Sequence, residues 1–281
     1  MAEITWLASF PKSGNTWMRI LMSNYRENGD EPVDINRLSA TSMASSRLWF
    51  DEWVGIEASL LPDRIVERLR PHAMRLMATR EPGPLVVKIH DSWHVTDIGE
   101  TLVPTDVTAG VIYLVRHPFD VALSNSHHYG ESLAESVQRL LGRPRRTPAA
   151  DSTPGTVSDQ LPVKVGSWAE HVSGWLDSGM RTCVIRYEDL RADPIAEFTR
   201  VVEFMNWDLD HQRIRQAVKF SQFDELQRQE SESGFKERAH RSTANFFRSG
   251  ISGQGADLLS GSEKRDLMES GRGIMERLAY L

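Results

Sequence analysis

The residues best suited to chemistry lie near the start of the chain, in the segment 10–17, which reads FPKSGNTW. It follows an apolar run and opens a helical pattern. Free N–H groups at a helix start, together with the helix dipole, bind phosphate oxygens, and Lys12 adds a full positive charge. Gly14 lets the backbone approach a ligand closely, while Ser13 and Thr16 supply hydroxyl donors. The segment predicts an anion-binding loop, and the alternative is a capped helix start with an exposed lysine.

The order of residues in this loop separates two classes of phosphate-binding protein. A nucleoside-triphosphate P-loop reads Gly, four residues, Gly-Lys-Ser/Thr, whereas Lys12 precedes the only glycine of this segment. The order Pro-Lys-Ser-Gly-Asn-Thr-Trp instead resembles the 5′-phosphosulfate loop of the cytosolic sulfotransferase family, a relative of the nucleotide kinases. The resemblance implies the donor 3′-phosphoadenosine 5′-phosphosulfate (PAPS). It places these residues around the donor: Lys12, Ser13, Gly14, Asn15, Thr16 and, stacked on adenine, Trp17.

A second pair of residues is similar to the family's 3′-phosphate site. Arg116 ends an apolar run, and Ser124 follows about two turns into the next helical pattern. An arginine fork and a hydroxyl can bind one phosphate together. Taken alone, the pair would favour a surface ion pair and an idle serine, and it is the presence of the first loop that favours the phosphate site.

The segment 246–253, FFRSGISG, is similar to the family's Arg-Lys-Gly-x-x-Gly segment, which covers the 3′-phosphate. Ser249 replaces the family lysine, so the site has one cation fewer. Arg248, the Gly250 backbone and the Ser249 hydroxyl remain to bind the phosphate. The resemblance also places four residues near the nucleoside, although buried aromatic residues usually belong to the core: Tyr187, Ser221, Phe223 and Phe247.

The segment 86–90, VVKIH, carries residues for the transfer itself. It predicts a strand that ends in His90, at the edge where parallel sheets present ligands. In the family the matching histidine takes the acceptor's proton, and a side chain whose ordinary pKa is about 6.5 suits that role. Lys12 and Lys88 are placed to neutralise charge in a loose, in-line transition state. The resemblance also implies that Lys12 rests on Ser124 until the acceptor arrives.

No metal is expected. His90 and His94 have the spacing of a metal pair on a helix, but the residues that precede His90 predict a strand.

Composition narrows the class of protein. The 281 residues are 40% hydrophobic and 26% charged, which is enough for a full core. A net charge of −6 disfavours sequence-independent nucleic-acid binding, so an anionic ligand needs a local cationic pocket. No apolar run approaches the roughly 18 residues that cross a bilayer, and no leader pattern opens the chain. We expect a cytoplasmic protein, without membrane insertion, whose single cysteine, Cys183, is buried and inert.

The elements that position these residues alternate along the chain. Apolar runs predict strands at 4–9, 85–90, 111–116 and 183–187, and helical patterns lie at 16–25, 118–129, 165–176 and 194–205. This alternation predicts an α/β, P-loop-like three-layer fold with a central parallel sheet flanked by helices. One helical face, Trp168, Val172, Trp175 and Leu176, should pack on the sheet. Without a repeat or a composition shift, 1–281 is expected to be a single sulfotransferase domain.

Two stretches carry none of these motifs. Residues 30–83 are expected to contact the acceptor. Residues 142–162 hold four prolines and two glycines without periodicity, which predicts a surface loop. Such a loop is either a lid over the site or disordered.

The sequence therefore predicts sulfonate transfer from PAPS to a hydroxyl or amine of a small-molecule acceptor, with His90 as base. Two other hypotheses stay open. The missing Gly-Lys-Thr and the two 3′-phosphate elements argue against an ATP-dependent small-molecule kinase. Lys12, Lys88 and His90 argue against a non-catalytic nucleotide-binding protein of the same fold. The sequence decides neither the acceptor nor whether the protein forms a homodimer.

Overall fold

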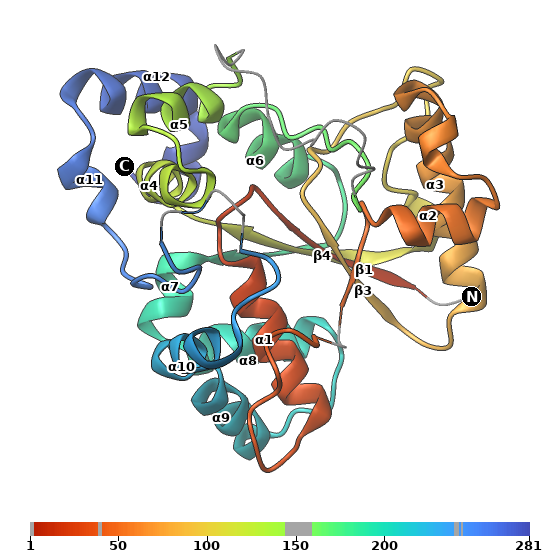
Figure 1. Cartoon of the computed structure of the whole chain (residues 1–281), viewed down its shortest axis with the longest axis horizontal. Helices are drawn as coiled ribbons and strands as arrows, with labels where there is room; N and C mark the ends of the chain where they lie inside the picture. Colours follow the sequence, from red (N-terminus) through yellow and green to blue (C-terminus); the bar gives the residue numbers. More distant parts are fainter. Residues whose placement is uncertain (1–2, 39–40, 144–158, 239–241, 243) are drawn as a thin grey trace.

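A parallel sheet forms the centre of the molecule (Figure 1). The computed structural model describes residues 3–38, 41–143, 159–238, 242 and 244–281. Within them, five strands pair in parallel in the order β2-β3-β1-β4-β5. The strands are β1 (Ile4–Ser9), β2 (Ser42–Met43), β3 (Leu85–Ile89), β4 (Thr108–Val115) and β5 (Thr182–Arg186). The predicted α/β fold is confirmed.

Helices cover both faces of this sheet (Figure 1). One face carries α1 (Asn15–Glu27), α8 (Pro194–Phe204) and α9 (His211–Phe220). The other carries α3 (Asp63–Arg80), α4 (Pro118–Tyr129), α6 (Trp168–Leu176) and α12 (Gly261–Arg277). The other α-helices of the described residues are α2 (Arg47–Val54), α5 (Leu133–Leu140), α7 (Tyr187–Ala192), α10 (Phe223–Ser233) and α11 (Gln254–Leu258). None of the helices in the described ranges is long and apolar enough to cross a bilayer.

Alternation along β1 divides the interior into two cores, because successive strand side chains point to opposite faces. Trp6 packs into the core beneath α4, α6 and α12, whereas Leu7 packs into the core beneath α1, α8 and α9. Trp168, Val172 and Trp175 are buried as predicted.

Cys183 lies in the core beneath α1, α8 and α9, as its apolar surroundings in the sequence predict. Burial raises the pKa of its thiol, so less of it is present as the reactive thiolate.

Local chemistry explains where the predicted elements shift. The helix predicted at 165–176 begins at Trp168 because Ser167 caps it: Ser167 Oγ accepts from the Glu170 N–H, and Glu170 accepts from the Ser167 N–H. The sequence patterns do not predict β2, which has only two residues. Most of the predicted loop 142–162, namely 144–158, lies outside the described residues.

A buried ion pair fixes the end of β3. Asp91 follows His90, and its two carboxylate oxygens accept hydrogen bonds from Arg70 of α3 at 2.9 and 2.6 Å. Both side chains are almost fully buried. The Asp91 carbonyl also accepts from Trp175 Nε1 of α6 at 2.9 Å. Two helices thus hold the residue beside His90 in place.

Replacing Asp91 by Ala should destabilise the fold strongly, because the Arg70 guanidinium would stay buried without its partner. We expect the free energy of unfolding to fall by about 3–5 kcal/mol, measured by urea denaturation. The control is Arg68→Ala. Arg68 lies on the same helix as Arg70, and its substitution removes only an exposed ion pair with Asp97, so the urea midpoint should barely move. Equal midpoints for the two variants would contradict a stabilising buried pair.

Candidate active site

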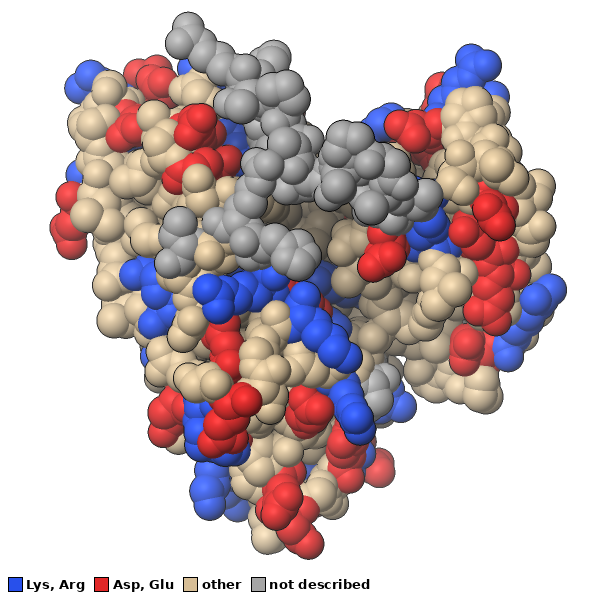
Figure 2. Space-filling model, viewed as in Figure 1, with Lys and Arg blue, Asp and Glu red and all other residues tan. Residues whose placement is uncertain are grey.

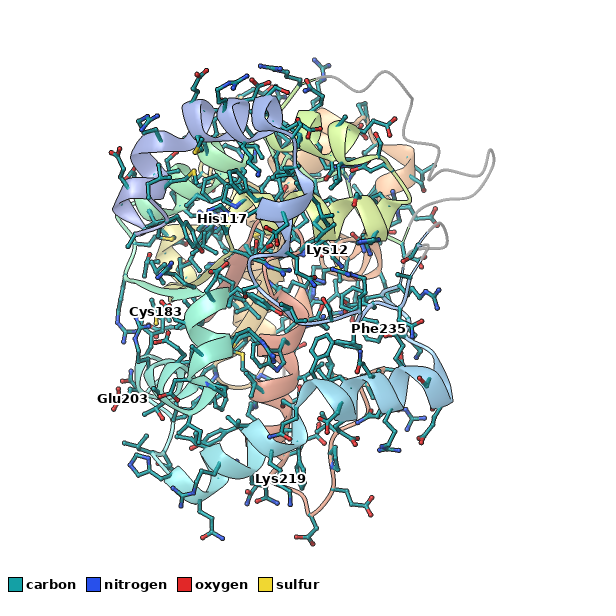
Figure 3. The ribbon with its side chains drawn as sticks, turned by 90° about the vertical axis from the view of Figure 1, so that its left-hand side faces the viewer. Lys12, His117, Cys183, Glu203, Lys219 and Phe235 are labelled. Atoms are coloured by element: carbon teal, nitrogen blue, oxygen red, sulfur yellow. The ribbon has the colours of Figure 1, made fainter. Side chains whose placement is uncertain are left out.

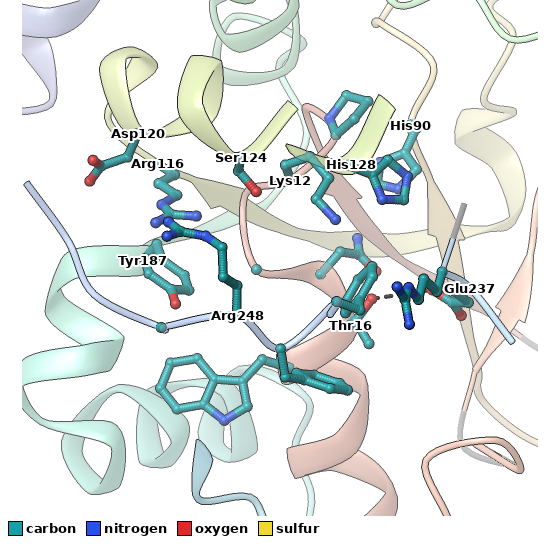
Figure 4. A pocket seen from close by; sticks show the side chains of 18 of the residues that line it. Lys12, Thr16, His90, Arg116, Asp120, Ser124, His128, Tyr187, Glu237 and Arg248 are labelled. Carbon is teal, nitrogen blue, oxygen red and sulfur yellow. Dashed lines mark hydrogen bonds between the residues drawn. The ribbon is translucent and has the colours of Figure 1, made fainter. Parts of the chain in front are cut away.

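A cavity of about 520 Å³ opens where β3, β1 and β4 end (Figure 4). Its walls come from the loop after β1, from α4 and from the C-terminal segment around Arg248. Six cationic side chains line it: Lys12, Lys88, Arg116, Lys236, Arg238 and Arg248. Figure 2 shows Lys and Arg side chains gathered along the middle of this face. An acidic chain therefore has a local cationic pocket, as an anionic ligand requires.

The loop after β1 leaves the start of α1 open. Gly14 precedes the helix without a side-chain cap, and the first turn holds no acidic residue. Lys12 and Gly14 both have left-handed backbones, with φ of 70° and 101°. A Cβ at position 14 would lie 2.7 Å from the Tyr187 ring, so only glycine fits. The helix start is thus available to an anion, which argues against the capped alternative.

Lys12 lies near the centre of the molecule in Figure 3, and Lys219 lies at its edge. The Lys12 Nζ sits 3.8 Å from the centroid of the Phe246 ring. Burial, and next the charge of Lys88, lower the Lys12 pKa to about 7. The described contacts include no hydrogen bond from Lys12 to Ser124, so that pairing stays a prediction.

His90 has a defined tautomer. Its Nδ1 lies 2.8 Å from the Ser9 carbonyl oxygen, which can only accept, so Nδ1 carries the hydrogen and Nε2 keeps its lone pair. Burial, followed by the charge of Lys88, lowers the His90 pKa to about 3. His171 Nε2 donates to the His90 carbonyl at 3.2 Å, and His171 Nδ1 accepts from the Tyr113 hydroxyl. His90 is therefore a fixed, neutral imidazole on the cavity wall.

Arg116 and Ser124 line the same cavity, from the end of β4 and from α4. The guanidinium carbon of Arg116 lies 4.3 Å from the Tyr187 ring centroid, and its Nη2 donates to the Ile251 carbonyl. Its buried Nε has no hydrogen-bond partner among the described residues. Within the same ranges, the Ser124 hydroxyl also makes no hydrogen bond. Both residues retain donors for a ligand, as the predicted phosphate site requires.

Two buried carboxylates hold the C-terminal part of the site. Glu230 accepts from the consecutive N–H groups of 246–247 at 2.7 and 2.9 Å. Asp120 accepts from the N–H groups of Gly253 and Gly255 at 2.7 and 2.8 Å. The cavity-lining segment is thereby fixed to α10 at one end and to α4 at the other.

Most of the predicted binding residues meet at this cavity. Besides the loop, Arg116 and Ser124, the predicted residues on its wall are Tyr187, Phe223, Phe247, Arg248, Ser249 and Gly250. The hydroxyl of Ser249 and the guanidinium of Arg248 both donate to Gln254 Oε1, at 3.3 and 3.0 Å.

Two predicted residues, Ser13 and Ser221, do not line the cavity, whereas Asn15 lines it and also binds the backbone. Ser13 is fully buried and does not line the cavity. The Asn15 side chain donates to the Leu7 carbonyl at 3.0 Å, which ties the loop to β1. Ser221 is buried, and its carbonyl accepts from Trp17 Nε1 at 2.8 Å, which fixes the indole on the cavity wall.

The sequence motifs miss several residues that line the cavity, among them His128 and Glu237. His128 lines the same cavity as His90, and burial, then Lys12, lower the pKa of His128 to about 3. It follows Ser124 by one helical turn, so helical spacing alone could have found it. Glu237 lies on the same side of the cavity, and no sequence pattern signals it. In the described part of the chain, no group of three or more His, Cys, Asp or Glu could hold a metal.

An open helix start and a cation-lined cavity at the carboxyl ends of parallel strands are typical of α/β proteins that bind phosphorylated ligands. The sulfotransferase domain family is matched by residues 3–264. The chain therefore belongs to this family.

Individual relatives are distant. Over 221 residues the chain is 25% identical to rat sulfotransferase 2A1. The matched region covers 77% of this chain and 64% of that protein. Over 261 residues it is 24% identical to rat sulfotransferase 1 family member D1, with 88% and 75% covered. The chain thus spans less than two thirds of the first of these relatives. The crystal structure of mouse sulfotransferase SULT7A1, complexed with PAP, shares the fold at a TM-score of 0.60 and 17% identity, covering 97% of this chain and 84% of that one.

The charge of Lys12 should make phosphate binding depend on pH. Lys12 is about half charged at pH 7, and a bound phosphate should raise its pKa, so binding takes up a proton above pH 7. We expect the affinity for 3′-phosphoadenosine 5′-phosphate (PAP) to fall by up to about tenfold per pH unit between about pH 7 and 9. Calorimetry in buffers of different ionisation enthalpy measures the uptake.

The matched control for this titration is Lys12→Arg. An arginine keeps its charge throughout this pH range, so uptake at pH 8 should disappear in the variant. If the unchanged protein binds PAP at pH 8 without taking up protons, the assigned charge state of Lys12 is wrong.

Proposed function

We propose that this protein transfers the sulfonate group of PAPS to a hydroxyl or amine of a small-molecule acceptor. Membership of the sulfotransferase domain family supports this. The observation with the most weight is that two regions with donors suited to phosphate line one cavity. The loop at Lys12 and the open start of α1 suit the 5′ end of the donor, while Arg116, Ser124 and Arg248 suit a 3′-phosphate. A nucleoside triphosphate needs only the first region.

His90 acts as the base in this proposal. The acceptor oxygen forms its bond to sulfur as the bond from sulfur to the phosphate oxygen breaks, and His90 Nε2 takes the acceptor's proton. The products are the sulfated acceptor and PAP. The hydrogen bond from Nδ1 to the Ser9 carbonyl supports this assignment, because it leaves Nε2 free of hydrogen. Lys12 and Lys88 neutralise charge on the leaving phosphate oxygen.

The acceptor binds on the side of the cavity that holds His90. Met43 of β2, His128 and Tyr129 line the cavity and supply apolar and imidazole surface. Met43 belongs to the stretch 30–83, which supports a role of that stretch in acceptor contact. We further propose that the whole chain works as one catalytic domain.

Nucleotide titrations test the donor. We expect PAP to bind with micromolar affinity, and ADP and ATP at least about tenfold more weakly, because neither offers a 3′-phosphate to Arg116 and Arg248. Isothermal calorimetry without added metal gives the three affinities. Tighter binding of ATP than of PAP would favour the kinase hypothesis. Absence of PAP binding would refute the donor site.

Removing the base should separate turnover from binding. We expect His90→Asn to lower the rate of PAP release from PAPS, with a panel of phenols and alcohols as acceptors, by about 10²–10⁴-fold. PAP affinity should change by less than about threefold, whereas Arg116→Ala should weaken it by about tenfold or more. In the unchanged protein His90 stays neutral, so its protonation should cause no loss of rate between about pH 7 and 5. Equal losses of affinity and turnover in both variants would contradict these roles.

A further inference from the structure

Two acidic residues line the cavity: Asp120 binds backbone N–H groups, whereas Glu237 lies among the cations. Glu237 Oε2 accepts hydrogen bonds from Lys88 Nζ and from Thr16 Oγ1, each at 3.2 Å. Its Oε1 pairs with the guanidinium of Arg19. Figure 4 shows Glu237 at the end of the cavity that also holds His90 and His128. A carboxylate there needs a physical reason, because it repels an anionic donor.

The reason lies in the charge of Lys88. Its side chain is only 9% exposed, and a buried ammonium without an anion tends to lose its proton. Burial lowers the Lys88 pKa, and the adjacent Glu237 opposes this while Arg19 adds to it. Lys12, His90 and His128 line the same cavity and are cationic or neutral. The two neighbours of Glu237 in sequence, Lys236 and Arg238, line it too, and both are basic residues.

The carboxylate is itself held in place. Arg19 lies one turn beyond Thr16 on α1, so both face Glu237. Arg19 is nearly buried, and its Nε donates to Thr41 Oγ1 at 2.7 Å, which fixes the guanidinium. Burial opposes ionisation of Glu237, but Lys88 and Arg19 outweigh it and lower the Glu237 pKa to about 2. The carboxylate is therefore charged throughout the physiological range.

We propose that Glu237, anchored by Arg19, is a positioning residue that keeps Lys88 charged and directed toward the sulfonate end of the cavity. An ammonium has three hydrogens, and the bond to Glu237 leaves two for the donor. Lys88 stands two residues before His90, so its charge lies next to the base. The inference rests on the proposed function, because only an anionic donor makes a charged Lys88 useful.

Proton uptake on PAP binding tests this without knowledge of the acceptor. Glu237→Gln removes the negative charge at nearly constant size, so more of Lys88 should be neutral in the free protein. The 5′-phosphate of PAP should then recharge Lys88. We expect uptake at pH 8 to exceed that of the unchanged protein by up to one proton. At pH 6 the variant should still bind PAP. Calorimetry in paired buffers measures both.

Two further variants show where the extra proton goes. Glu237→Asp keeps the charge and should match the unchanged protein. Adding Lys88→Gln to Glu237→Gln should abolish the extra uptake.

Equal uptake in the unchanged protein and Glu237→Gln, extra uptake that persists without Lys88, or loss of PAP binding by Glu237→Gln at pH 6 would each overturn the inference. If the unchanged protein itself fails to bind PAP, the proposed function fails, and the inference falls with it. The two failures are thus distinguishable.

Discussion

This site depends on one constraint: several positive charges must lie close together before any ligand is present. Lys12, Lys88 and Arg116 share one cavity. Burial lowers the pKa of both lysines, and like charge adds to this effect, from Lys88 and Arg116 at Lys12 and from Arg19 at Lys88. Arginine stays protonated when it is buried near other cations, whereas lysine readily loses its proton there. The two lysines therefore differ: Lys12 is about half charged at pH 7, whereas Glu237 supports the charge of Lys88.

Carboxylates remote in sequence make this arrangement rigid. Asp91 fixes the strand end that carries the base, and it does so through a buried pair with Arg70. Asp120 and Glu230 bind backbone N–H groups on either side of the Arg248 segment. Each accepts two backbone hydrogen bonds, which lets a buried charge remain satisfied. These carboxylates fix the backbone that carries the hydrogen-bond donors of the cavity. The donors therefore need no hydrogen bonds to one another to stay in position.

The sequence predicts what depends on neighbouring residues. The anion loop is contiguous, so the lysine, the glycine and the helix start can be recognised together, and the four main strands follow from short apolar runs. Glu237 reaches its partners across 149 and 221 residues, and no local pattern encodes such contacts. Ser13 and Asn15 match the motif in residue type. The turn from strand to helix nevertheless directs the Asn15 amide back to β1. Motif position alone does not say which side chains face the ligand.

The left-handed backbone at Lys12 sets ligand binding against the stability of the fold. For a residue other than glycine this conformation costs about 1–3 kcal/mol, and the same lysine carries its charge in an unfavourable environment. Asparagine tolerates such a backbone without bringing a charge. A laboratory selection for heat resistance alone would thus favour loss of the loop's cation, whereas selection for ligand capture would retain it. Thermostable variants of this chain should be checked first at residue 12.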